Sequence, residues 1–201
     1  MRKGLLIVIS GASGTGKGTV CKKLLADLPK VAYSISATTR KPRVGEQNGR
    51  EYHFLSVDEF KSWISEEKFL EYAEVYGNFY GTPLNMIEEQ LNRGEDVLLE
   101  IDVQGALNVK QKCPEGIYIF LLPPSLNELK RRIEGRGTEN PESLARRLKN
   151  ALSEIKIGLQ YDYVVVNDTI DNAAAQIKAI LTAERLKVAR NAEKFDLEGD
   201  I

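Results

Sequence analysis

The sequence predicts an α/β fold built on a parallel sheet. Apolar runs without polar alternation recur along the chain, and such runs are typical of strands that are buried on both faces. They span residues 5–9, 31–36, 97–102, 117–122 and 163–166. Segments with helical spacing separate them, and strands that alternate with helices form parallel sheets. We expect ligands to bind at the carboxyl ends of these strands.

The first strand leads directly into a glycine-rich loop, since residues 5–19 read LLIVISGASGTGKGT. Glycines let successive N–H groups turn around an anion, the following helix adds its positive end, and Lys17 brings a full charge to the outer phosphates. A plain glycine-rich turn is the alternative, but the flanking strand and helix favour a phosphate-binding loop. The predicted phosphate ligands are Gly11, Ala12, Ser13, Gly14, Thr15, Gly16, Lys17, Gly18 and Thr19.

The loop departs from the common pattern at the position after the lysine. Ser or Thr usually stands there and holds magnesium, whereas here the residue is Gly18 and the hydroxyl follows at Thr19. We therefore expect magnesium to be coordinated through water. Glu100 and Asp102 end the third apolar run. Buried carboxylates need a cation, water or a polar substrate group nearby, although both residues could simply reach solvent.

Residues 37–91 interrupt the alternation of buried strands and helices, and we expect an inserted lobe with antiparallel strands. The polar run over 36–54 carries Arg40 and Arg43, three positions apart and followed by Tyr52. Arginine forks match phosphate oxygens bidentately, so these residues form a predicted phosphate cradle. The other elements expected in this segment are a helix after a capping box at 56–59, short strands at 70–75 and 78–80, and a helix beginning with Thr82 and Pro83.

A second group of arginines lies around the sequence GRGTENP at 135–141. The helix before it carries Arg132, and the helix after it carries Arg146 and Arg147. A glycine-flanked arginine between two helices suits a mobile flap over a reaction centre. The alternative is a solvated helical hairpin, but a phosphate loop in the same chain favours the flap. A phosphate loop with several further arginines suggests two phosphate-bearing substrates, and phosphoryl transfer depends mainly on positioning and charge neutralisation.

The composition disfavours several other kinds of site. The chain has 201 residues, a net charge of −1, one histidine and two cysteines. This charge gives no global attraction to nucleic acid, and His53 alone cannot build a zinc site of several histidines or fit a nucleophile-elbow hydrolase. Cys21 and Cys113 are interpreted as buried thiols of a reducing compartment. Without a signal peptide or a membrane-length apolar run, we expect a cytoplasmic protein with no membrane partner.

Longer motifs extend along most of the chain. They are TTRKPRVGEQNGREYHF at 38–54, EYAEVYGNFYGT at 71–82, LLEIDVQG at 98–105 and EGRGT at 134–138. Together they resemble the guanylate kinase family. The resemblance implies a P-loop kinase fold, with a five-stranded parallel sheet flanked by helices, an inserted GMP-binding lobe and a helical lid. It implies one domain over 1–201, divided into a core of 1–36, 92–134 and 148–201, a lobe of about 37–91 and a lid of about 135–147.

The resemblance also implies an activity, the ATP-dependent phosphorylation of GMP, and of dGMP, with release of ADP in purine nucleotide metabolism. Magnesium would be held by ATP phosphates and water, near Thr19, Glu100 and Asp102. The implied guanine-binding residues are Ser36, Glu71, Thr82 and Asp102, and those for the GMP phosphate are Arg40, Arg43, Tyr52 and Tyr80. The implied catalytic residues are Lys17, Arg136 and Arg147, with Arg132 and Arg146 as helpers. The oligomeric state stays open.

Two other functions fit parts of the sequence. A small kinase for another acceptor, such as a sugar phosphate, would share the phosphate loop but would not need Glu71 and Tyr52. Guanylate-kinase-like scaffold modules bind phosphopeptides without catalysis, and they typically have a damaged phosphate loop. Here Gly11, Gly16 and Lys17 are present. We therefore expect an ATP:GMP phosphotransferase.

Overall fold

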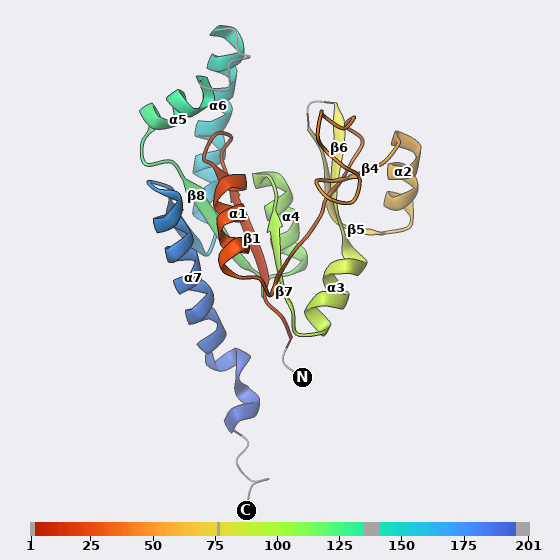
Figure 1. Ribbon diagram of the computed structural model, residues 1–201, viewed down its shortest axis with the longest axis vertical. Helices are drawn as coiled ribbons and strands as arrows, with labels where there is room; N and C mark the ends of the chain where they lie inside the picture. Colours follow the sequence, from red (N-terminus) through yellow and green to blue (C-terminus); the bar gives the residue numbers. More distant parts are fainter. Residues whose placement is uncertain (1–2, 76, 135–140, 196–201) are drawn as a thin grey trace, which may run out of the picture.

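The computed structural model describes residues 3–75, 77–134 and 141–195, and a five-stranded parallel sheet forms the centre of this part (Figure 1). Its strands are, in spatial order, β2 (Val31–Tyr33), β7 (Asp96–Glu100), β1 (Leu6–Gly11), β8 (Ile117–Leu122) and β9 (Tyr163–Val166). All neighbouring pairs are parallel, as the alternation of strands and helices predicts. Because β1 is central, the loop that follows it opens at the middle of the carboxyl edge.

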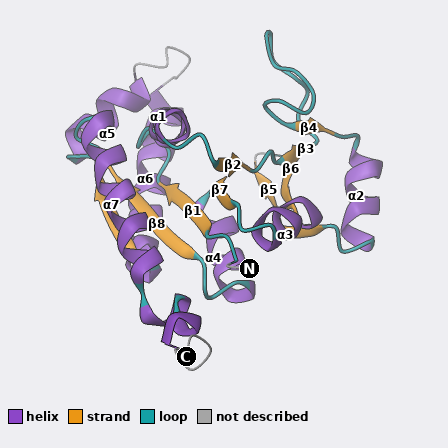
Figure 2. Cartoon of the chain, turned by 60° about the horizontal axis from the view of Figure 1, so that its bottom comes forward, coloured by secondary structure: helices purple, strands orange, loops and turns teal. Residues whose placement is uncertain are grey.

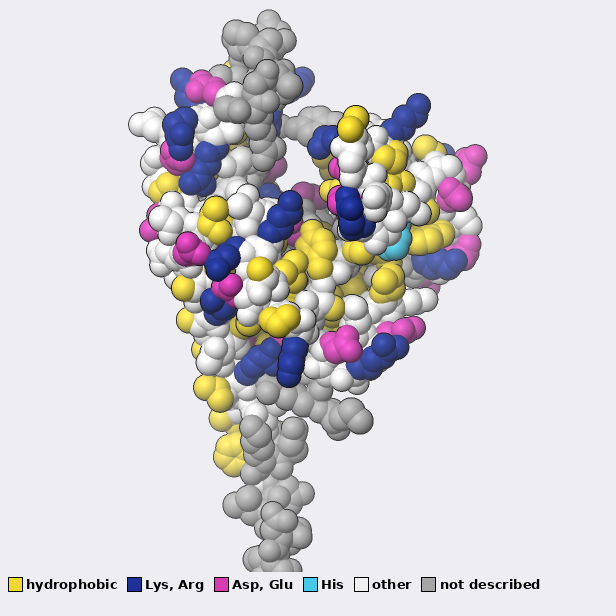
Figure 3. All heavy atoms as spheres, viewed as in Figure 1, with side chains coloured by type: hydrophobic (Ala, Val, Ile, Leu, Met, Phe, Trp, Pro, Cys, Tyr) yellow, Lys and Arg dark blue, Asp and Glu magenta, His cyan; other side chains and the backbone are white. Residues whose placement is uncertain are grey.

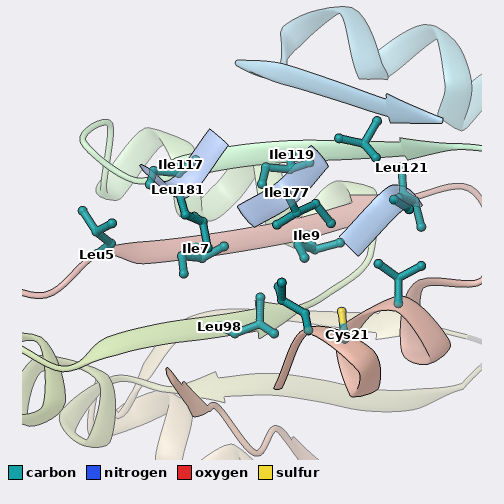
Figure 4. Packing of buried hydrophobic residues seen from close by; sticks show 14 residues of the cluster. Leu5, Ile7, Ile9, Cys21, Leu98, Ile117, Ile119, Leu121, Ile177 and Leu181 are labelled. Atoms are coloured by element: carbon teal, nitrogen blue, oxygen red, sulfur yellow. The ribbon is translucent and has the colours of Figure 1, made fainter. Parts of the chain in front are cut away.

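Side chains along residues 5–9 alternate between the two faces of this sheet. Leu5, Ile7 and Ile9 pack with α1 (Lys17–Asp27) and α7 (Ile170–Leu186) (Figure 4). Leu6 and Val8 pack on the other face with α3 (Leu84–Asn92) and α4 (Val103–Lys112). Because helices cover both faces of the sheet, the side chains on both sides of this strand are apolar, and its sequence does not alternate between apolar and polar residues. The core thus gives the phosphate loop a fixed starting point.

A four-stranded sheet lies beside the first one (Figure 2). Its strands are, in spatial order, β4 (His53–Phe54), β3 (Ala37–Thr38), β6 (Asn78–Pro83) and β5 (Phe69–Val75). β6 pairs antiparallel with β3 and β5, while β4 pairs in parallel with β3. α2 (Val57–Ser65) begins with the predicted capping box. Its Phe60 ring stacks on the Phe69 ring, with the ring centroids 4.4 Å apart. The antiparallel character expected of this segment is confirmed.

Two further helices, α5 (Leu126–Glu134) and α6 (Pro141–Ile157), lie next to the phosphate loop. Leu129, Ile133 and Ala151 on these helices pack against Ala12 of the loop. Short 3₁₀ helices occur at Gly158–Gln160, Val188–Arg190 and Ala192–Phe195. Across the described ranges, no helix has the length and apolar character needed to cross a membrane. The residue bounds expected for the core, lobe and lid stay a prediction.

Several element boundaries expected from the sequence differ in the structure. The strand expected over 97–102 ends at Glu100, and Asp102 is the N-cap of α4. The helix expected to have Thr82 as its cap and Pro83 as its first residue starts one position later, because α3 begins at Leu84 with Pro83 as its N-cap, and Thr82 belongs to β6. Thr82 pairs with Glu71 across β5 and β6, so non-local strand pairing overrides the local capping pattern. The second strand, expected over 31–36, ends at Tyr33, after which the chain leaves the central sheet toward β3.

Candidate active site

The phosphate loop joins the end of β1 to the start of α1, and glycine is required at two of its positions. Gly14 and Gly16 have φ angles of 90° and 89°, which L side chains rarely adopt. A Cβ at Gly16 would also lie 2.6 Å from Asn167 Nδ2. Since α1 begins at Lys17, the helix N-terminus meets the loop at the carboxyl edge of the sheet. A glycine-rich loop at a helix N-terminus is a favourable place for an anion such as phosphate.

Side chains from distant elements hold the phosphate loop in place. Asn167 Nδ2 donates to the Thr15 carbonyl at 2.7 Å. Arg132 on α5 donates to the same carbonyl at 3.3 Å and to the Asn167 carbonyl at 3.1 Å. The Thr15 hydroxyl donates to the Ala12 carbonyl at 2.8 Å. Arg132, which the resemblance implies as a helper of the lid, therefore supports the loop from α5.

α6 contacts the same loop through two residues that lie two helical turns apart. Arg147 Nη2 donates to Ser13 Oγ at 3.1 Å, and the Ser13 N–H donates to Glu154 Oε2 at 3.1 Å. Residues seven apart share one face of a helix, so this face of α6 is directed at the loop. Arg146 is exposed on the same helix. Arg136 lies outside the described residues.

Lys17 is surrounded by oxygen atoms. Its ammonium group donates to the carbonyl of Gly11 at 2.5 Å. Burial lowers the pKa of Lys17, and the negative charges of Glu100, Glu154 and Asp102 act against that shift. The Gly11 carbonyl thus holds the Lys17 ammonium group against the loop.

The carboxylate of Glu100 lies next to the position where phosphate loops usually carry a hydroxyl. A Cβ at Gly18 would lie 3.3 Å from Glu100 Oε1, and the Tyr33 hydroxyl donates to Glu100 Oε2 at 3.3 Å. Within the described ranges, no group of three or more His, Cys, Asp or Glu side chains could hold a metal by itself. A carboxylate beside the loop fits magnesium that takes its ligands from phosphates and from water molecules bound to that carboxylate.

A cavity of about 240 Å³ lies between the loop and the second sheet. Its lining contains Lys17 together with residues implied to bind GMP, namely Ser36, Tyr52, Glu71, Tyr80 and Asp102. The surface is hollowed between the α5–α6 end and the second sheet, with Lys and Arg side chains on both sides (Figure 3). A larger cavity of about 500 Å³, lined by Lys3, Leu91 and Arg190 among others, contains none of the predicted site residues.

Glu71 is a buried carboxylate of the smaller cavity, with 6% of its surface exposed. The Thr82 hydroxyl, opposite it across β5 and β6, donates to Glu71 Oε1 at 2.6 Å. Burial raises the pKa of Glu71 to about 7. The Thr82 hydrogen bond opposes this shift, the charge of Asp102 adds to it, and Lys112 opposes it weakly. A buried acceptor of this kind suits a ligand that brings hydrogen-bond donors.

Arg40 contacts Tyr52, which lines the same cavity together with Tyr80. Its guanidinium lies 5.3 Å from the Tyr52 ring centroid, and the Tyr52 and Tyr80 rings meet edge to face at 6.0 Å. Glu46 holds Arg40 bidentately, at 2.9 and 3.0 Å, and also accepts the Arg43 N–H at 2.7 Å. The Arg43 side chain is exposed. Of the two arginines predicted to bind phosphate, Arg40 thus has its guanidinium paired with Glu46, whereas Arg43 contacts Glu46 through its backbone N–H.

Comparison with known proteins identifies the family to which this site belongs. The family model described as guanylate kinase matches residues 3–184. The chain belongs to the guanylate kinase family. The guanylate kinase of Clostridium acetobutylicum is 56% identical over 189 residues, which cover 94% of this chain and 90% of that protein. The guanylate kinase of Caldanaerobacter subterraneus is 52% identical over 194 residues, which cover 96% and 94%.

A solved guanylate kinase structure agrees with the fold. The crystal structure of guanylate kinase from Anaplasma phagocytophilum superposes with a TM-score of 0.79 at 38% identity, covering 94% of this chain and 90% of that one. Family membership confirms the resemblance, the P-loop kinase fold and an ATP-dependent enzyme that phosphorylates GMP to GDP. Kinases of this family generally need a divalent metal. The non-catalytic scaffold and the sugar-phosphate kinase are set aside.

Three side chains at this guanylate kinase site were not predicted from the sequence, namely Glu46, Glu154 and Asn167. Glu46 stands six positions after Arg40 in a basic segment, so an ion pair could have been suspected. Glu154 accepts a hydrogen bond from Ser13, which is 141 positions away in the sequence, and Asn167 donates one to Thr15, which is 152 positions away. No local pattern signals such contacts, because the tertiary fold alone brings these residues to the loop.

Proposed function

We propose that this chain binds ATP at the phosphate loop and GMP in the cavity lined by Glu71, and that it transfers the γ-phosphoryl group to GMP or dGMP. One observation carries the proposal: Lys17 and Glu71 line the same cavity. A phosphate-binding cation and a buried acceptor for a base thus share one space. The cytoplasmic location and the lack of nucleic-acid and membrane partners stay predictions.

The donor phosphates are held by the loop N–H groups and by Lys17, which exchanges the Gly11 carbonyl for phosphate oxygens. Arg147 beside Ser13, together with Arg136, neutralises the charge that develops on the transferred group. Arginines in this role are worth about 10³–10⁵ in rate. Glu100, Thr19 and Asp102 would hold magnesium through water, and the bound ion would add to this neutralisation.

The acceptor base is selected by Glu71, Thr82, Ser36 and Asp102. Guanine presents two donors, N1–H and the N2 amino group, to a carboxylate, whereas adenine has an acceptor at N1. The GMP phosphate is held by Arg40, Arg43, Tyr52 and Tyr80. With GMP bound, the Arg40 guanidinium donates both to this phosphate and to Glu46. The acceptor phosphate is already anionic at neutral pH, so the transfer requires no general base.

An ADP-release assay with ATP and magnesium tests the proposed function. GMP, AMP, CMP and UMP are offered separately, and we expect turnover with GMP alone. Turnover with another acceptor would keep the kinase chemistry but contradict the assignment of the base pocket. GMP binding without turnover of any acceptor would contradict the proposed catalysis.

The KM for GMP is expected to depend on pH because the pKa of Glu71 is about 7 in the free enzyme. Below this pH the carboxyl group is protonated, so it loses its charge and places a hydrogen-bond donor opposite the guanine donors. The KM for GMP should therefore rise about tenfold for each pH unit below 7. Above it the KM should reach a plateau. The GMP phosphate also titrates, with a pKa of about 6, so Glu71→Gln serves as the control. An identical pH profile in that variant would contradict the role of Glu71.

Binding of both nucleotides is expected to close the lobe and the lid over the sheet. Closure would complete the contacts of the lid arginines with the donor and exclude water that would otherwise hydrolyse ATP. Small-angle scattering should show a smaller radius of gyration with an analogue that joins both nucleotides than without ligand. ATP alone serves as the control for partial closure. No compaction with the joined analogue would contradict this expectation.

A further inference from the structure

Gly105, in the first turn of α4, stands directly against the carboxylate of Glu71. A Cβ placed on Gly105 would lie 2.8 Å from Glu71 Oε2 and 3.2 Å from Glu71 Cδ. It would also lie 3.6 Å from Asp102 Oδ2. Gly105 is buried and lies within the helix, and its φ is not positive. The backbone conformation therefore suits any residue except proline, and the neighbouring carboxylate is what favours glycine here.

The two carboxylates next to Gly105 are each fixed on another side. Glu71 Oε1 receives the Thr82 hydroxyl at 2.6 Å. Asp102 is the N-cap of α4, and its Oδ1 accepts the N–H of Gln104 at 2.8 Å and that of Gly105 at 3.0 Å. Gly105 is thus the place where β5 and the start of α4 bring both carboxylates together.

We propose that Gly105 is a positioning residue for guanine recognition, because its missing side chain lets the Glu71 carboxylate lie against α4 beside Asp102. This inference rests on the proposed role of Glu71 as the acceptor for the guanine donors. A methyl group at position 105 displaces that carboxylate while the Thr82 hydrogen bond holds its other oxygen. A shift of about 1 Å in a positioned group costs up to about 10²-fold.

The same substitution is mild for the fold. The nearest atom to the added Cβ belongs to the end of a side chain, not to the backbone. Alanine is also the better helix former, since glycine inside a helix loses more conformational entropy on folding. Gly105→Ala therefore leaves the melting temperature unchanged or raises it, while it weakens GMP recognition. If Gly105 had only a structural role, its substitution would lower the stability and the activity of the enzyme together.

The test compares Gly105→Ala with the wild-type enzyme by steady-state kinetics, GMP titration calorimetry and thermal unfolding. We expect the KM and Kd for GMP to rise by about 10- to 100-fold, with kcat at saturating GMP and the KM for ATP within about twofold. Asn108→Ala, one turn further along α4, is the matched control and should leave all values unchanged. In a Glu71→Ala background, Gly105→Ala should add no further loss, because the displaced group is gone.

Three results overturn the inference: an unchanged KM for GMP, a joint fall of kcat, ATP affinity and melting temperature, or a full effect that persists in the Glu71→Ala background. The wild-type acceptor assay separates this failure from that of the proposed function. If the wild-type enzyme phosphorylates GMP and Glu71→Ala weakens GMP binding, a negative result for Gly105→Ala overturns the positioning role alone.

Discussion

Lys17→Met is expected to lower kcat by about 10³-fold while GMP binding stays close to that of the wild-type enzyme. Methionine keeps the length of the side chain but removes the charge that neutralises the transferred phosphoryl group. Removing one preorganised donor from a transition state costs about 10²–10³ in rate, and a full charge belongs at the upper end of this range. The ADP-release assay measures the loss, and GMP titration calorimetry measures the binding that remains.

Lys22→Met is the matched control for this variant. Lys22 is exposed on the same helix, one turn beyond the phosphate loop, so its loss leaves the charge at the loop unchanged. We expect near wild-type kcat for this control. If Lys17→Met keeps more than about a tenth of the wild-type kcat, Lys17 does not serve the transition state as proposed.

The phosphate loop could be predicted from the sequence because all its determinants are local. The apolar strand, the positive-φ glycines and the first turn of α1 follow one another without interruption between Leu6 and Lys17. Each element limits the conformation of the next, so a linear motif carries the geometry. The buried strands were predicted for a similar reason, since a sheet covered on both faces leaves long apolar runs.

The base pocket could not be derived from such patterns. Glu71 reaches the cavity only because β5 pairs with β6, and the sequence around it shows no sign of its partner Thr82. Its role came from the resemblance to a family. The contact with Gly105 joins two elements 34 positions apart, counted from 71 to 105, and a glycine inside a predicted helix has no local signature of function. Close approaches of this kind become visible only with the fold.

Glu71→Gln is expected to lower kcat/KM for GMP by up to about 10⁴-fold, the loss seen when a polar pocket is left with an unpaired group. The amide is nearly isosteric, and its oxygen can still accept the Thr82 hydroxyl, so the cavity keeps its shape. However, the N–H groups of the amide would then face the N1–H and N2 amino groups of guanine, which are also hydrogen-bond donors. The charge-assisted hydrogen bonds are lost, and donors meet donors in a buried site. The ADP-release assay measures this loss as a higher KM for GMP.

Glu74→Gln, an exposed position on the same strand β5, is the matched control and should leave the kinetics unchanged. The KM for ATP should be unaltered in both variants, because neither residue belongs to the phosphate loop. Glu71→Gln should also flatten the part of the GMP pH profile that Glu71 causes, since the amide does not titrate. Loss of affinity without this flattening would assign the defect to packing. If Glu71→Gln leaves the GMP kinetics unchanged, a residue other than Glu71 recognises the base.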